Sequence, residues 1–231
     1  MIEQALRFPF GTADDRGATA EALLVGGGLH VLAAFVPVVP LIPVMGYLVR
    51  VLGAAGEADD PADLPTFRSP ASLVRDGLVG GVLALGFCLV PVVLLVVTVG
   101  GALSGGAAGG PIDPTTPLGY GVTLIGGTIT LLLAVAVVYP LPAVIAGYAR
   151  ADPEAGTLTR VRTAFSRRRL RASVTSGRYF YAWTVGVVLL LFGAALASAG
   201  TRFTRLVGFF GLFYLEVAAA AAWSRGVGGN D

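Results

Sequence analysis

Residues 77–112 read GLVGGVLALGFCLVPVVLLVVTVGGALSGGAAGGPI and contain no Asp, Glu, Lys or Arg. A bilayer hydrocarbon core about 30 Å thick is crossed by roughly 20 apolar helical residues, so this run is long enough to span it. A second run, Leu206–Ser224, carries a single acid, Glu216. Three more uncharged runs are Ala22–Val49, Pro114–Ala149 and Tyr179–Thr201. The pattern predicts an all-α, polytopic transmembrane helical bundle of five spans, with six as the alternative.

The composition agrees with a membrane location. Charged residues make up 13 % of the chain, against about 25 % in ordinary soluble domains. A length of 231 residues holds one bundle and no separate soluble domain, so 1–231 is predicted to be a single integral domain of the cell membrane. All 16 basic residues are Arg, a bias that fits a GC-rich, halophilic, archaeal source. The single cysteine, Cys88, excludes an internal disulfide.

The predicted spans differ in how regular they are. They cover residues 18–50, 77–103, 118–149, 179–200 and 206–224. The first contains Pro37, Pro40 and Pro43, and proline removes a backbone donor and bends a helix. It is therefore either one long kinked helix or a re-entrant pair of half-helices. The kinked helix is favoured because each half alone is too short to cross a bilayer. A bend is also expected near Pro140 and Pro142.

Arginine placement sets the orientation. The loop 150–178 carries eight Arg and the loop 51–76 carries two, whereas the segment 104–117 carries none. Cytoplasmic loops are rich in Lys and Arg, so 51–76 and 150–178 are predicted to be cytoplasmic. Five spans would put the N-terminus outside. A re-entrant first span would put both ends inside, which Arg7 and Arg16 favour.

Two segments about a hundred residues apart resemble each other. Gly46-Tyr47 precedes Arg50 in one, and Gly147-Tyr148 precedes Arg150 in the other, each pair after a proline-bent stretch. The likeness indicates a parallel internal repeat of span, cytoplasmic loop and span. Such repeats occur in transporters and also in inert scaffolds, and a chance likeness is the alternative.

The stretch RVRTAFSRRRLR, residues 160–171, suggests a basic amphipathic helix lying on the cytoplasmic leaflet. Leu158, Val161 and Phe165 fall on one face of such a helix. A plain topology-setting loop is the alternative, and nucleic-acid binding is disfavoured because only Phe165 offers a stacking surface. A second candidate interfacial helix is 1–10. The predicted contacts to anionic lipid headgroups are Arg160, Arg162, Arg167, Arg168, Arg169 and Arg171.

Several short motifs point to a known family. They are Arg7-Phe8-Pro9, Gly46–Leu52 (GYLVRVL), Leu64-Pro65-x-Phe67, Leu73-Val74-x-Asp76-Gly77-Leu78 and Phe213–Ala218 (FYLEVA). Over most of its length the chain resembles an uncharacterised multi-pass membrane family, abundant in haloarchaea and classed as a domain of unknown function, DUF4013. The resemblance implies a membrane location and no established activity. It also implies an uncharged polar residue where this chain has Glu216, so the chain departs from the family there.

Two residues inside the predicted spans carry chemistry. Glu216 lies about ten residues into the last span, so about 15 Å deep. Ionisable groups at such depth usually face the bundle interior or water, so Glu216 is a candidate proton or cation site. His30, the only histidine, is a candidate partner or proton relay. The alternatives are a protonated acid bonding a neighbouring helix and a histidine in an interhelical hydrogen bond.

No nucleophile with its base, no paired carboxylates and no metal-ligand spacing stand out. We therefore expect no enzyme, cofactor or metal site. The acidic residues Glu57, Asp59, Asp60 and Asp63 are interpreted as a solvated loop. The first functional hypothesis is a non-enzymatic membrane scaffold or organising protein, whose partner is the lipid bilayer. The second is a small transporter or channel using Glu216 and His30. An intramembrane enzyme ranks last.

Overall fold

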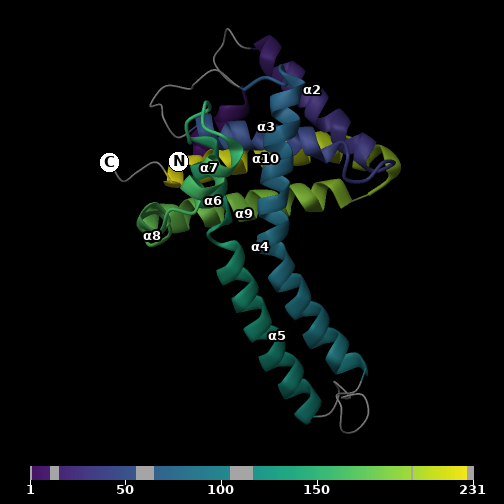
Figure 1. Ribbon diagram of the computed structural model, residues 1–231. Coiled ribbons are helices and arrows are strands. Elements are labelled where there is room, and N and C mark those ends of the chain that lie inside the picture. Colours follow the sequence, from purple (N-terminus) through teal and green to yellow (C-terminus); the bar gives the residue numbers. More distant parts are fainter. Residues whose placement is uncertain (1, 11–15, 56–64, 105–116, 199, 228–231) are drawn as a thin grey trace. The chain divides into compact units, whose positions relative to one another are not determined.

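The regular structure of the described residues is helical throughout, which confirms the all-α prediction. The computed structural model describes residues 2–10, 16–55, 65–104, 117–198 and 200–227 (Figure 1). The helices are α1 (Ile2–Arg7), η1 (Phe8–Phe10), α2 (Arg16–Ala33), α3 (Leu41–Ala54), α4 (Pro70–Ser104), α5 (Pro117–Val138), α6 (Leu141–Ala149), α7 (Thr157–Ala164), α8 (Arg167–Val174), α9 (Gly177–Ser198) and α10 (Arg202–Val227). The predicted acidic loop at 57–63 lies outside the described residues.

Within the described residues, four stretches are long and apolar enough to cross a membrane: 70–97, 124–149, 177–198 and 202–227. The second predicted span thus begins seven residues before its predicted start at 77. Proline suits the first turn of a helix, because the amide hydrogen it lacks would have no partner there. The charged pair Arg75-Asp76 marked this stretch as loop in the sequence, but both residues are helical.

The first predicted span is not one kinked helix. It forms α2 and α3, and residues 34–40 between them are not helical. Val38 has a φ of 74°, a left-handed conformation that a continuing helix does not allow. With 18 and 14 residues, the two helices are about 27 and 21 Å long. Figure 1 shows them as separate rods joined by a turn.

The chain divides into two compact units. Unit 1 comprises 1–81 and 142–231, and unit 2 comprises 82–141. In unit 1, α10 is the central helix and contacts α9, α2, α3 and α1. The alanine run Ala218–Ala222 on α10 is fully buried, because small side chains let neighbouring helices approach closely.

Unit 2 contains the rest of α4 from Val82 and all of α5. Its apolar side chains are largely exposed, as at Leu85 and Leu131. The helix α5 ends at Val138, and α6 begins at Leu141. The helix is therefore interrupted at Pro140, where the sequence predicts a bend.

The two segments expected at the membrane surface are both helical, and their place at the surface stays a prediction. The N-terminal segment packs on α10, with Phe8 buried and the Tyr214 hydroxyl donating to the Leu6 carbonyl. The basic stretch is not one helix, because α7 ends at Ala164 and α8 begins at Arg167. Leu158, expected on the apolar face that would meet lipid, is exposed.

Candidate functional site

The structure brings together the two intramembrane residues that the sequence singled out. His30 on α2 places its Nε2 3.3 Å from Oε1 of Glu216 on α10 and 3.2 Å from Oε2. The side chain of His30 is 7 % exposed and that of Glu216 is 18 % exposed. The contact joins residues 186 positions apart in sequence, so it ties α2 to α10.

The contact of the second ring nitrogen of His30 determines which of its two nitrogens carries a hydrogen. Its Nδ1 lies 2.9 Å from the carbonyl oxygen of Gly26, which can only accept, so Nδ1 carries a hydrogen. The Nε2 atom then either accepts a proton from the Glu216 carboxyl or, as imidazolium, donates to the carboxylate. A bare Nε2 lone pair facing a carboxylate would be repelled. The arrangement therefore favours one proton held between the two side chains.

An aromatic cluster lies beside this pair. The ring of Phe213 on α10 is 6.0 Å from that of His30 and 5.6 Å from that of Tyr47 on α3. Tyr47 in turn stacks on Phe67 with ring centroids 4.5 Å apart. Phe67 comes from the predicted cytoplasmic loop, and no local pattern around it predicts its contact with Phe213 of α10. The cluster gives the His30–Glu216 contact an apolar wall, which strengthens polar interactions next to it.

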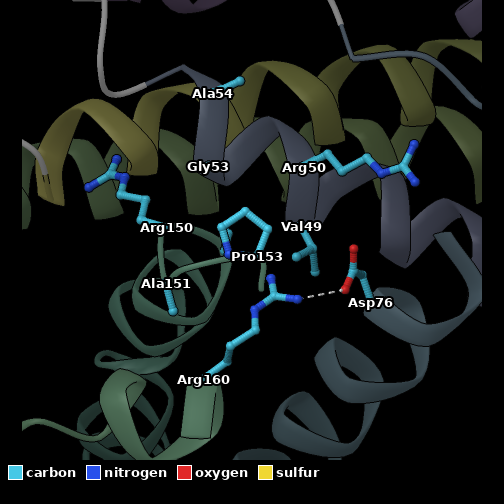
Figure 2. Close-up of a pocket in the computed structure, with 10 residues that line it drawn as sticks. Val49, Arg50, Gly53, Ala54, Asp76, Arg150, Ala151, Pro153 and Arg160 are labelled. Carbon is cyan, nitrogen blue, oxygen red and sulfur yellow. Dashed lines mark hydrogen bonds and ion pairs between the residues drawn. The ribbon is translucent and has the colours of Figure 1, made fainter. Parts of the chain in front are cut away.

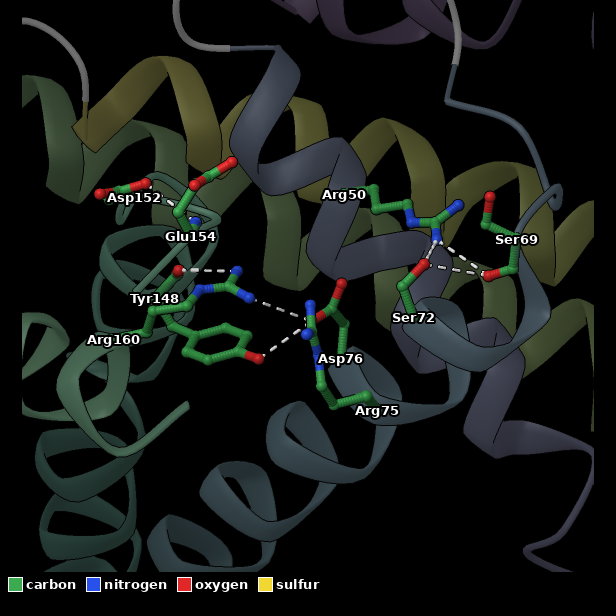
Figure 3. A network of polar contacts seen from close by, with 9 residues as sticks. All are labelled: Arg50, Ser69, Ser72, Arg75, Asp76, Tyr148, Asp152, Glu154 and Arg160. Carbon is green, nitrogen blue, oxygen red and sulfur yellow. Dashed lines mark hydrogen bonds and ion pairs between the residues drawn. The ribbon is translucent and has the colours of Figure 1, made fainter. Parts of the chain in front are cut away.

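A second polar cluster surrounds Asp76 on α4. Its Oδ1 accepts a hydrogen bond from the Tyr148 hydroxyl at 2.9 Å and lies 3.4 Å from Nη1 of Arg160. Arg75 approaches the same oxygen at 3.4 Å. Figure 3 shows the three side chains converging on this carboxylate from α4, α6 and α7. The buried carboxylate of Asp76 thus interacts with two guanidinium groups and one phenol hydroxyl.

Arg160 is held on several sides. Its guanidinium lies over the Tyr148 ring at 4.2 Å, and Nη2 donates to the Tyr148 carbonyl at 3.3 Å. The residue is only 5 % exposed. Arg160 therefore does not lie on the surface as expected, because its charge is buried and paired with Asp76, and a contact to lipid headgroups stays a prediction. Nothing within the run 160–171 distinguishes it from the other arginines, since its partner lies 84 positions away.

Two further arginines hold segments of unit 1 together. Arg50 at the end of α3 donates to the carbonyl oxygens of Thr66 and Arg68 at 2.8 and 2.9 Å, and to the Ser72 hydroxyl at 2.8 Å. Arg150 donates to the carbonyl and hydroxyl oxygens of Ser224 on α10, both at 2.8 Å. These are the two arginines of the proposed repeat, and their partners differ. The repeat itself stays a prediction.

A pocket of about 390 Å³ lies between these clusters (Figure 2). Its lining includes the charged residues Arg50, Asp76, Arg150 and Arg160, and the small residues Gly53 and Ala54. In Figure 2 the guanidinium of Arg160 reaches between Pro153 and Asp76. All of these residues belong to unit 1.

The remaining arginines of the basic stretch face outward. Arg162, Arg167, Arg168, Arg169 and Arg171 are all exposed. Arg167, Arg168 and Arg171 line an open hollow on α8. Within the described residues, no group of three or more His, Cys, Asp or Glu side chains is placed to hold a metal ion.

Comparison with known proteins identifies the family. Residues 29–201 match a family described as "Protein of unknown function (DUF4013)". The chain belongs to the DUF4013 family. The matched region contains His30 and the whole Asp76–Tyr148–Arg160 cluster, and it ends before Glu216. No curated protein and no solved structure shows a significant match. With its apolar helices, this DUF4013 chain is a membrane protein of a family of unknown function.

Proposed function

We propose that the chain is a non-enzymatic integral membrane protein that organises anionic lipid at the cytoplasmic face. One observation carries this: its buried charges serve as ties between elements, while the arginines of α8 are left exposed. Arg50, Asp76 and Arg160 each bond to segments distant in sequence. These buried side chains are suited to stabilising the fold. The exposed arginines are suited to binding headgroup phosphates.

The lipid proposal is tested on the whole protein in nanodiscs containing both phosphatidylglycerol and phosphatidylcholine. We expect native mass spectrometry to find the anionic lipid enriched on the wild type. Enrichment should fall in the triple variant R167Q/R168Q/R171Q. The control is R202Q/R205Q, which removes two exposed arginines from the first turn of α10 and leaves α8 unchanged. Equal enrichment in all three proteins, or none in the wild type, would reject the proposal.

The topology proposed with this function has α2 and α3 as a re-entrant pair and both termini cytoplasmic. Two observations support it. Neither helix is as long as the four candidate spans. The guanidinium of Arg225, near the end of α10, lies 5.6 Å from the ring of Phe8, so the N-terminal segment packs at the C-terminal end of that helix. A topology reporter fused to the N-terminus should show that this end lies in the cytoplasm. If the reporter shows that this end lies outside, the five-span arrangement would be favoured instead.

A second candidate function is proton-linked transport, which the contact between His30 and Glu216 favours. Ionisable pairs within a membrane are typical of proton relays. The test is proton flux into proteoliposomes that contain a pH-sensitive dye. Flux through the wild type should disappear in E216Q and H30Q and persist in D152N, whose carboxylate is exposed. An inactive wild type, or an active E216Q, would remove this candidate.

A further inference from the structure

We propose that the pocket beside Arg160 binds a phosphate group, carried either by a lipid headgroup or by a small soluble phosphate ester. This site is separate from the α8 surface and goes beyond the proposed function. It is built from α3, α4, the segment after α6, and α7. The proposal rests on the charge of the lining, one buried donor and the size of the cavity.

The lining carries more positive than negative charge. Arg50, Arg150 and Arg160 line the pocket together with one acid, Asp76. That acid is shared, since Arg75 and Arg160 both lie 3.4 Å from its Oδ1. The acceptors found for Arg50 among the described residues are carbonyl and hydroxyl oxygens, which satisfy its hydrogens without neutralising its charge. A pocket with this balance attracts an anion.

One donor in the pocket lacks an acceptor. The Nε of Arg160 is buried and has no hydrogen-bond partner among the described residues. The other guanidinium nitrogens are taken by Asp76 and by the carbonyl of Tyr148. A buried donor without a partner is costly and is usually satisfied by a bound water or ion. Phosphate oxygens match guanidinium hydrogens in geometry and charge, so a phosphate is the strongest acceptor for this position.

The cavity has room for more than the phosphate alone. Its volume of about 390 Å³ falls within the usual range for small-molecule sites. Gly53, Ala54 and Ala151 contribute little side-chain volume, and Val49 and Pro153 add apolar surface. A phosphate bound to Arg160 could therefore keep a short organic group, such as glycerol, against the apolar part of the lining. Both a phospholipid headgroup and a soluble phosphate ester have this chemistry.

Binding is read from the thermal unfolding of the full-length protein, followed by tryptophan fluorescence. Trp183 and Trp223 are the two tryptophans of the chain, and both lie in unit 1 with the pocket. Three probes are compared: inorganic phosphate, glycerol 3-phosphate, and nanodiscs of phosphatidylglycerol against phosphatidylcholine. Chloride at matched ionic strength corrects for screening. We expect a saturable rise in the melting temperature with at least one phosphate probe.

The probes separate the two sources. A rise with inorganic phosphate and glycerol 3-phosphate in detergent assigns the site to soluble ligands. A rise confined to phosphatidylglycerol nanodiscs assigns it to headgroups. If no probe gives more than the chloride control, the orphan donor is satisfied by water and the proposal is overturned.

A matched pair of variants locates the site. Pro153 is exposed, lines the pocket and sits in the turn closed by the Ala155 amide and the Asp152 carbonyl. P153E and P153Q lose the proline alike and differ only in charge. We expect P153E to weaken binding of the active probe at least tenfold and P153Q less than threefold.

The third variant separates this pocket from the α8 surface. The triple variant R167Q/R168Q/R171Q should bind the active probe as the wild type does. Equal binding by P153E and P153Q, or loss of binding in the α8 variant with retention in P153E, would overturn the proposal. Neither result would bear on lipid enrichment at α8, so failure here is distinguishable from failure of the proposed function.

Discussion

The helix α4 belongs to two different environments along its length. In its first part, within unit 1, Leu73, Asp76 and Gly77 are buried against other elements. In its second part, within unit 2, Leu85 is 66 % exposed and Leu89 56 %. Both parts are helical, but only the first contains charged residues and a glycine, Gly77, that packs closely against α3. The comparison indicates that protein contacts stabilise unit 1, whereas the apolar surface of unit 2 depends on hydrocarbon or a partner to cover it.

The chain offers a separate optical probe for each unit. Trp183 and Trp223 report on unit 1, and the free cysteine Cys88, once labelled with a fluorophore, reports on unit 2. Unfolding by sodium dodecyl sulfate in mixed micelles can therefore be followed in both.

The largest effect is expected from D76N. The substitution removes the carboxylate shared by Arg75 and Arg160 and leaves a buried guanidinium without its counter-ion. Breaking a buried pair in this way costs about 4 kcal/mol. The tryptophan transition should shift to lower detergent fraction while the Cys88 transition moves less. D152N, at an exposed position, should change stability by less than about 0.5 kcal/mol. Equal shifts for the two variants would mean that the Asp76 cluster is not a stabilising tie.

F213A should be nearly as damaging. The ring of Phe213 is fully buried and contacts those of Tyr47 and Phe67, so its removal leaves a cavity in the aromatic cluster. We expect a loss of about 3 kcal/mol in the tryptophan transition. The control is L131A in unit 2, where a side chain 64 % exposed leaves no cavity, and the expected loss is below about 1 kcal/mol. A larger loss of stability for L131A than for F213A would mean that the tightly packed core lies in unit 2 and not in unit 1.

Replacing two glycines of α4 by alanine should affect stability differently. A Cβ added at Gly77 would overlap the carbonyl oxygen of Ile42 on α3, whereas one added at Gly86 would meet nothing within 4 Å. Overpacking a close contact costs about 2 kcal/mol, so G77A should destabilise unit 1. G86A should be neutral or stabilise by up to about 1 kcal/mol, because alanine favours helix. Destabilisation of similar size by both variants would show that Gly86 also faces a close neighbour.

The sequence predicted those features that the bilayer itself imposes. Charge-free runs of about 20 residues are required by the hydrocarbon thickness, so the long helices could be found without knowing any contact. The bend at Pro140 follows from the chemistry of proline. The contact between His30 and Glu216 was foreseen for a related reason, since two ionisable groups in apolar runs have few other partners.

The features that were missed depend on contacts between distant residues. Proline predicts that the first span bends, but whether the chain kinks or turns back depends on how α2 and α3 pack against α10. Arg75 and Asp76 marked the start of α4 as loop, because the sequence does not show that Tyr148 and Arg160 lie beside Asp76. The burial of Arg160 was missed for the same reason. The missing information was tertiary pairing, which local pattern does not carry.

The smallest effect is expected from the contact between His30 and Glu216. Interhelical hydrogen bonds within membranes are worth about 0.6 kcal/mol on average, and a pair with ionisable partners should exceed that average, so we expect a coupling energy of about 1 kcal/mol between H30Q and E216Q. A double-mutant cycle followed by tryptophan fluorescence measures it. The control cycle pairs H30Q with S224A, whose hydroxyl bonds to the Leu52 carbonyl about 12 Å further along α10. That pair should be additive within about 0.5 kcal/mol. If the first cycle is also additive, the two groups are neighbours without a shared proton, and the case for proton-linked transport loses its physical basis.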